Sequence, residues 1–85
     1  MTEYIVYVLK SLNSDHYYVG QTINLKRRIQ EHNSRKVFWT KRYAPWIIIY
    51  TEKYTTREEA VKREKYFKSH AGRNWLKSSA CSLIG

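Results

Sequence analysis

The sequence predicts an α+β domain: a three-stranded antiparallel sheet flanked by helices, in the element order β-β-α-β-α-α. Two β-branched and aromatic runs stand close together near the start of the chain, and a third lies near its middle. Segments with helical periodicity follow the second and third runs. The 85 residues suffice for a single domain over residues 1–85 with a modest core, and no repeat or linker divides them.

The first 20 residues predict an antiparallel hairpin with a long loop. Residues 4–9 form a continuous apolar run, which is typical of a strand covered on both faces. Turn-forming residues occupy 11–15, and residues 17–19 form a second short strand. Gly20 is expected to close that strand, where a glycine marks a bulge or the close approach of another backbone.

A helix is predicted over residues 25–34. Asn24 is a favourable N-cap, and Leu25 and Ile29 are spaced to contact the core. Arg28 and His32 are also four residues apart, so they share one face of this helix.

Residues 35–45 form a basic, aromatic connection that ends at Pro45. The following run, residues 46–50, is the clearest strand of the chain, and we expect it to be central in the sheet. Gly72 is expected to break the chain before a short terminal helix at residues 73–77.

The helix at residues 57–68, which begins with a capping box (Thr-x-x-Glu at 56–59), has a carboxylate on its inward stripe. That stripe comprises Ala60, Val61, Glu64 and Phe67. A charge that faces a core must be paired or must bind a cation, because unpaired burial is costly. Glu64 is therefore a candidate Mg²⁺ ligand. The alternative is an ion pair with a nearby cation, either Arg28 or Lys68.

The charge balance indicates a polyanionic partner. Lysine and arginine total 16 against 7 acidic residues, a formal charge of +9. Such an excess favours nucleic acid. Anionic membrane is the competing partner, but no helix pairs a broad apolar face with a basic one. A basic surface with no further role is the third interpretation.

Cysteine usage and hydropathy suggest a cytosolic protein. The lone Cys81 cannot form an internal disulfide, and we expect it in a frayed C-terminal segment with no role. No Cys/His spacing suggests zinc, no signal peptide is visible, and no apolar stretch approaches the ~18 residues of a membrane span.

Four further residues could take part in phosphate chemistry. Tyr7 and Tyr18 lie near one another in the predicted hairpin, and a perturbed phenol can transfer protons. The alternative is that both simply fill strands, as aromatic residues do. Arg28 could bind a phosphate, although it could equally be an ordinary surface arginine, and His32 could move a proton.

Together, in this order, these residues resemble the GIY-YIG endonuclease family. Residues 5–7 (Ile-Val-Tyr) stand where the family has Gly-Ile-Tyr, and residues 18–20 (Tyr-Val-Gly) where it has Tyr-Ile-Gly, with ten residues between them. Arg28 matches the family's catalytic arginine, His32 a position that is histidine or tyrosine, and Glu64 the metal-binding glutamate. The resemblance covers roughly residues 4–70 and is greatest to small, single-domain bacterial members.

The resemblance departs from the family pattern at one position and leaves another open. Ile5 replaces a glycine of the first triplet, which removes backbone freedom but no functional group. Several members carry an asparagine downstream of the glutamate, and Asn74 is a candidate whose register is uncertain.

The resemblance implies hydrolysis of a DNA phosphodiester with one divalent ion, Mg²⁺ or Mn²⁺. Glu64 then holds the metal, and Tyr7 or Tyr18 deprotonates or orients the attacking water. Arg28 stabilises the added negative charge, and His32 supports the proton transfers.

A basic, aromatic set of residues is expected to contact DNA: Lys26, Arg27, Arg35, Lys36, Trp39, Lys41 and Arg42. The alternative is that the aromatic connection packs on the core.

No sequence-reading module is visible, so we expect structure-selective or weakly selective cleavage of branched, flapped or single-stranded DNA. This would serve DNA repair, recombination or related processing, with a protein partner or homo-oligomer supplying any higher specificity. The alternatives are a non-catalytic nucleic-acid-binding protein and an RNA-directed accessory factor.

Overall fold

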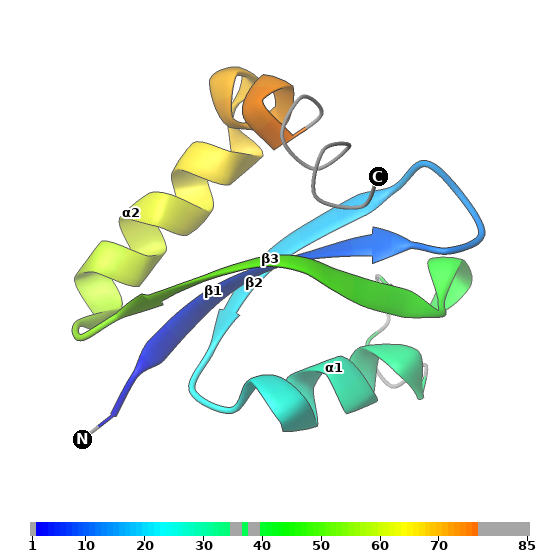
Figure 1. The fold of residues 1–85 in the computed structure, drawn as a ribbon, viewed down its shortest axis with the longest axis horizontal. Coiled ribbons are helices and arrows are strands. Elements are labelled where there is room, and N and C mark those ends of the chain that lie inside the picture. The colour runs from blue at the N-terminus through cyan, green and yellow to red at the C-terminus, as the bar shows by residue number, and fades with distance from the viewer. Residues whose placement is uncertain (1, 35–36, 38–39, 77–85) are drawn as a thin grey trace.

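The structure, a computed structural model, describes residues 2–34, 37 and 40–76. Its elements follow the predicted order (Figure 1). They are β1 (Tyr4–Ser11), β2 (Tyr17–Thr22), α1 (Leu25–Asn33), the 3-10 turn η1 (Lys41–Tyr43), β3 (Trp46–Tyr54), α2 (Arg57–Lys68) and a final helix at 70–76.

The sheet is antiparallel throughout, with the strand order β2-β1-β3. The central strand is β1, and its run from Val6 to Leu9 is buried on both faces, as predicted. The expected central position of β3 is wrong. β3 is an edge strand, and Ile48 on it is 40% exposed. The register shifts opposite Val8 and Leu9, so the isoleucine run of β3 does not alternate regularly between the faces.

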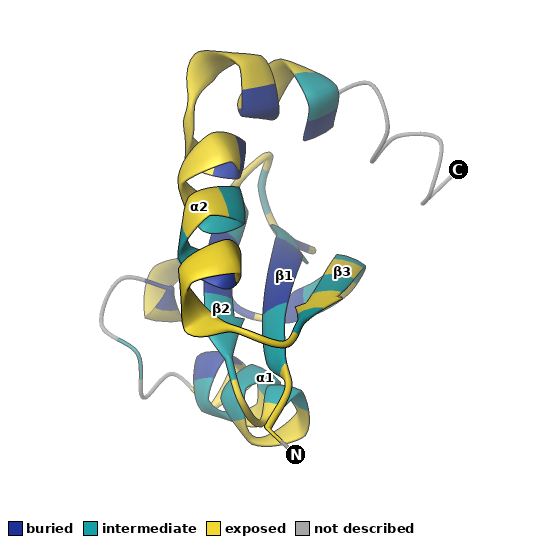
Figure 2. Ribbon diagram, turned by 90° about the vertical axis from the view of Figure 1, so that its left-hand side faces the viewer, coloured by how far each residue is buried: buried dark blue, intermediate teal, exposed yellow. Residues whose placement is uncertain are grey.

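Helices cover both faces of the sheet, α2 and the final helix on one side and α1 on the other (Figure 1). Figure 2 shows that the exposed residues of α2 lie on its outer side and the buried ones toward the strands. Each face has its own apolar core. The α2 side is built on Val6, Val8, Val19, Ala60, Phe67 and Leu76, and the α1 side on Tyr7, Leu9, Ala44 and Trp46.

The predicted helix starts are confirmed by their caps. The side chain of Asn24 accepts a hydrogen bond from the backbone N–H of Arg27 at 3.1 Å, and Leu25 and Ile29 pack on the core. The hydroxyl of Thr56 accepts from the N–H of Glu59 at 3.3 Å. Helix α2 has the predicted bounds, whereas α1 ends one residue early with Ser34 as its C-cap.

A carboxylate with four donors ties α2 to the edge strand. Glu52 on β3 accepts hydrogen bonds from the hydroxyls of Tyr50 and Tyr54, each at 2.5 Å. It also accepts two from the guanidinium of Arg63 on α2, at 2.7 and 3.0 Å. The bidentate pair lowers the pKa of Glu52 although burial opposes this shift, so the carboxylate stays charged.

The expected role of Gly72 as a chain break is wrong. The interruption falls at Ser69, and Gly72 lies inside the final helix, which starts before the predicted residue 73. A Cβ at Gly72 would lie 2.0 Å from the carbonyl oxygen of Tyr66 and 2.6 Å from the Cα of Phe67. Glycine is required here because the final helix packs directly on the backbone of α2.

We expect Gly72→Ala to lower the free energy of unfolding by about 2 kcal/mol, because the backbone cannot move aside as a side chain can. At an open helical position the same change is stabilising, by up to ~1 kcal/mol. Chemical denaturation measures the difference, with Arg73→Ala, at an exposed neighbouring position, as the control. A stabilised Gly72→Ala variant would contradict the close packing.

Candidate active site

The ring of Tyr7 lies across Gly20 of the neighbouring strand. The two residues are cross-strand partners, and a Cβ at Gly20 would be 2.6 Å from the Tyr7 hydroxyl and 3.0 Å from the Tyr18 ring. Gly20 does not close the strand as expected, since β2 continues to Thr22. The glycine does mark a close approach, but of two tyrosine rings rather than of another backbone.

The Tyr7 hydroxyl meets two side chains of α1. It hydrogen-bonds with Nε2 of His32 at 3.0 Å and accepts from Nε of Arg28 at 3.4 Å. The prediction that Arg28 and His32 share a helix face is therefore confirmed, and that face points at the sheet. Tyr7 is 1% exposed, so its hydroxyl depends on these partners.

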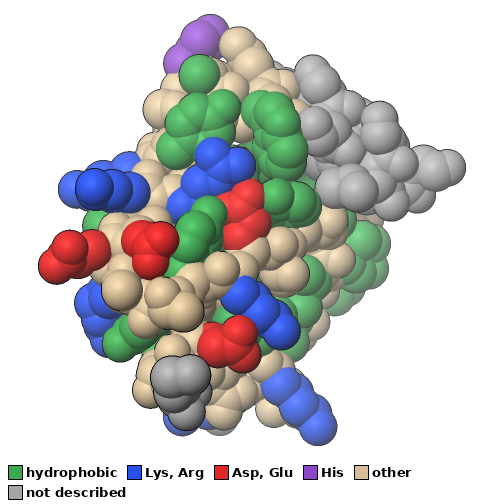
Figure 3. All heavy atoms as spheres, turned by 60° about the vertical axis from the view of Figure 1, so that its left-hand side comes forward, with side chains coloured by type: hydrophobic (Ala, Val, Ile, Leu, Met, Phe, Trp, Pro, Cys, Tyr) green, Lys and Arg blue, Asp and Glu red, His purple; other side chains and the backbone are tan. Residues whose placement is uncertain are grey.

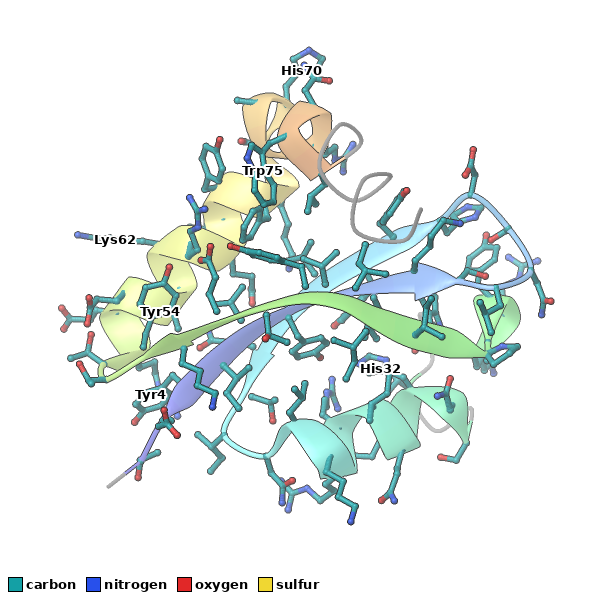
Figure 4. All side chains as sticks on the ribbon, viewed as in Figure 1. Tyr4, His32, Tyr54, Lys62, His70 and Trp75 are labelled. Carbon is teal, nitrogen blue, oxygen red and sulfur yellow. The ribbon has the colours of Figure 1, made fainter. Side chains whose placement is uncertain are left out.

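His32 is fully buried between α1 and the sheet (Figure 4). Its Nδ1 hydrogen-bonds with the hydroxyl of Thr40 at 2.7 Å. Thr40 is held in turn by Trp46, whose indole N–H donates to the Thr40 carbonyl at 2.9 Å. Sequence reasoning missed Thr40, and nothing in the basic segment around it signals this contact.

The surroundings fix three protonation states. Burial lowers the pKa of His32 to about 4, and the positive charge of Arg28 adds to the shift. Burial raises the pKa of Tyr7 to about 12, against the hydrogen bond from Arg28. That same bond to Tyr7 raises the pKa of Arg28 above its usual value. At neutral pH the imidazole is uncharged, the phenol protonated and the guanidinium cationic.

Tyr18 completes this cluster on the α1 side of the sheet. Its ring centroid lies 4.8 Å from that of His32 and 6.2 Å from that of Tyr7. Arg28 also forms an ion pair with Glu31 at 3.2 Å, in which about a third of each side chain is exposed. The structure thus brings together Tyr7, Tyr18, Arg28 and His32.

Glu64 approaches this cluster from α2. Ala60 and Phe67 on its helix are fully buried, whereas the Glu64 side chain is 21% exposed and lies at the margin of the buried face. It pairs with Lys68 at 3.3 Å, which is one of the two ion pairs considered from sequence. The negative charge of Glu64 is a minor cause of the raised pKa of Tyr7, behind burial.

The donor set around Glu64 fits a hard cation held by few protein ligands. Among the described residues, no three His, Cys, Asp or Glu side chains gather into a metal-binding group. A single carboxylate suits Mg²⁺ or Mn²⁺, which keep several waters and bind phosphate oxygens. A zinc site needs three or four protein ligands, and the described residues gather no such set.

The expected DNA-contacting residues are only partly described. Lys26, Arg27, Lys41 and Arg42 are exposed. Arg35, Lys36 and Trp39, as well as Cys81, lie outside the described residues. Asn74 is exposed on the final helix. On the face shown in Figure 3, acidic and basic side chains are mixed with apolar ones, so this side presents no uniform basic field.

Comparison with known proteins identifies the family. The GIY-YIG catalytic domain matches residues 3–77, and the chain therefore belongs to the GIY-YIG family, a family of endonucleases. In the part of the chain that the structure describes, no helix has the length and apolarity to cross a membrane.

Its relatives include UPF0213 proteins of several bacteria. That of Listeria welshimeri is 41% identical over 73 residues, covering 85% of this chain and 80% of the relative. That of Staphylococcus haemolyticus is 32% identical over 78 residues, covering 91% and 94%. The solution NMR structure of a UPF0213 protein from Bacillus halodurans has a TM-score of 0.55 at 29% identity, covering 89% of this chain and 83% of that one.

The buried neutral state of His32 predicts a pH-dependent stability. In the unfolded chain His32 is protonated as the pH falls through about 6.5. In the folded protein its pKa is about 4, so it stays neutral until the pH is much lower. The free energy of unfolding should therefore fall between these values, by at most about 3 kcal/mol. Denaturation at pH 7.5, 6.5, 5.5 and 4.5 measures this loss.

The matched variants are His32→Gln and His70→Gln. Replacing His32 should flatten the dependence between pH 6.5 and 4.5, whereas replacing the exposed His70 should leave it unchanged. If the free energy of unfolding depended equally on pH in both variants, His32 would have an ordinary pKa in the folded protein.

Proposed function

We propose that this chain is a metal-dependent endonuclease that hydrolyses DNA phosphodiesters during repair, recombination or related processing. One observation carries the proposal: the guanidinium of Arg28 and the imidazole of His32 meet on one buried phenol, that of Tyr7. A buried phenol, arginine and histidine in contact supply a proton path and a fixed positive charge at one place.

Arg28 supplies the charge that stabilises the transition state. It is cationic at every working pH, and its Nε is fixed by Tyr7 while its Nη1 is held by Glu31. A preorganised guanidinium stabilises the negative charge that grows on a phosphate under attack, without rearrangement during the reaction.

Tyr7 and His32 supply the proton path. A phenol with a pKa of about 12 is not a phenolate at neutral pH, so Tyr7 needs an acceptor for its own proton. When Nδ1 of His32 carries the ring proton and donates to Thr40, Nε2 is free to accept it. The attacking water then gives its proton to the Tyr7 oxygen as Tyr7 gives its own to His32. Tyr18, beside both rings, orients the water.

Glu64 would hold Mg²⁺ or Mn²⁺ against the scissile phosphate. When bound there, the ion neutralises phosphate charge and favours ionisation of a bound water. Lys68, the present partner of Glu64, is half exposed and free to turn toward solvent or phosphate.

The substrate we propose is DNA with a branch, flap or single-stranded part. The exposed cations Lys26, Arg27, Lys41 and Arg42 contact backbone phosphates, which position a duplex without reading its sequence.

The central test is a panel of labelled duplex, nicked, flapped, forked and single-stranded DNAs, each with Mg²⁺, Mn²⁺ or EDTA. We expect metal-dependent cleavage that Glu64→Gln reduces by two orders of magnitude or more, while most DNA binding remains. Binding without cleavage by the wild-type protein under every condition would instead identify a non-catalytic nucleic-acid-binding protein.

Two adjacent arginines on α1, Arg27 and Arg28, allow a matched pair of alanine variants. Arg28→Ala should lower kcat by about 10²–10³, since it removes charge from the transition state. Arg27→Ala removes an exposed cation and should leave kcat unchanged while lowering the salt slope of binding by about 1. The opposite ranking of the two variants would overturn the assignment of Arg28.

A further inference from the structure

A groove lies at the edge of the sheet that β2 forms, beside the end of α2 and the final helix. Its volume is about 440 Å³, within the usual range of ligand sites. Its lining residues include Tyr17, Tyr18 and the fully buried Phe67, together with the cations Lys68 and Arg73. A second hollow of about 250 Å³ shares four lining residues with the first, His16, Tyr17, Arg73 and Leu76, and is lined in addition by Asp15. We call the two together the β2 groove.

Two residues connect the β2 groove to the candidate active site. Tyr18 lines the groove while its ring lies 4.8 Å from that of His32. Lys68 lines it as well and forms the ion pair with Glu64. The groove therefore adjoins the site through Tyr18 and through Lys68, the ion-pair partner of Glu64, whereas Glu64 itself lines neither hollow.

The chemistry of the lining matches that of an unpaired nucleotide. Cations stand beside aromatic rings, so a phosphate and a base could be bound side by side. Lys10 lies over the Tyr17 ring, 5.7 Å from its centroid, and adds a further positive charge. Asp15 and Glu64 are the acids nearby, and Glu64 already has Lys68 as its counter-charge. A hollow of this size accommodates single nucleotides but not a base-paired duplex.

We propose that the β2 groove binds one or two unpaired nucleotides of the DNA strand that continues from the scissile phosphate. Arg73 contacts a phosphate, and Tyr17 stacks on a base. This rests on the proposed function and makes it more specific, because such a groove favours flapped and single-stranded substrates over blunt duplex.

The test is binding in EDTA, so that it does not depend on cleavage. Fluorescence anisotropy measures Kd for a single strand, a flapped duplex, a blunt duplex and an RNA single strand of the same sequence. We expect Arg73→Ala to weaken binding of the single strand and the flap about fivefold and of the blunt duplex less than twofold. The control is Lys62→Ala, which removes an exposed cation that points away from the body of the protein (Figure 4).

A second variant tests stacking. Tyr17→Leu retains an apolar side chain but removes the ring, and we expect a five- to tenfold loss for the single strand. Thermal unfolding checks that this variant is folded, and Arg73 is exposed, so its replacement leaves the core intact.

Three outcomes would overturn a claim. If Arg73→Ala and Tyr17→Leu bind single strands as Lys62→Ala does, the groove proposal fails while the nuclease proposal stands. If the protein bound the RNA strand more tightly than the DNA strand, the ligand of the groove would be RNA and the proposal of a DNA strand would be wrong. If the wild-type protein neither binds nor cleaves any DNA of the panel, the proposed function fails first.

Discussion

The burial of one phenol on the central strand constrains most of this structure. Tyr7 has no room above β2 unless residue 20 lacks a side chain, and Tyr7 is only 1% exposed, so its hydroxyl relies on protein partners. A buried hydroxyl without a partner costs about 1–3 kcal/mol, so α1 must present donors and acceptors at that point. Arg28 and His32 meet this need, and among the described residues no buried side-chain nitrogen or oxygen lacks a hydrogen-bond partner.

The two faces of the sheet have separate cores, and the proposed site depends on both. The α1 side carries Tyr7, Arg28 and His32, whereas Glu64 comes from α2. Glu52 accepts two hydrogen bonds from Arg63, the residue before Glu64. The guanidinium of Arg63 also lies 4.5 Å from the centroid of the Phe67 ring. These contacts fix the rotation of α2 about its axis, and so determine where the Glu64 carboxylate points.

Burial also decides the chemistry that these groups can perform. The same loss of water holds His32 neutral and Tyr7 protonated, so neither residue alone is the base that phosphodiester hydrolysis requires. In the proposed mechanism they act as a hydrogen-bonded pair, and a proton moves from water through the phenol to the imidazole. The β2 groove adjoins the site through Tyr18 and Lys68, and in our proposal it holds the unpaired part of the strand.

The sequence by itself determined the elements and the set of candidate residues, because both follow from local spacing. Apolar runs predicted the strands, Asn24 and Thr56 predicted the helix starts, and the four-residue interval put Arg28 and His32 on one face. The ordered motifs predicted the family, which the match over residues 3–77 confirms.

Only the tertiary structure decided how distant segments meet. The edge position of β3, the packing of Gly72 on Tyr66, and the contact between Thr40 and His32 each depend on residues brought together by folding. The partner of Glu64 is by contrast local, since Lys68 lies four residues further along the same helix, while folding places Arg28 against Tyr7. Periodicity reports which face a residue occupies, but the partner on that face is set by packing between elements.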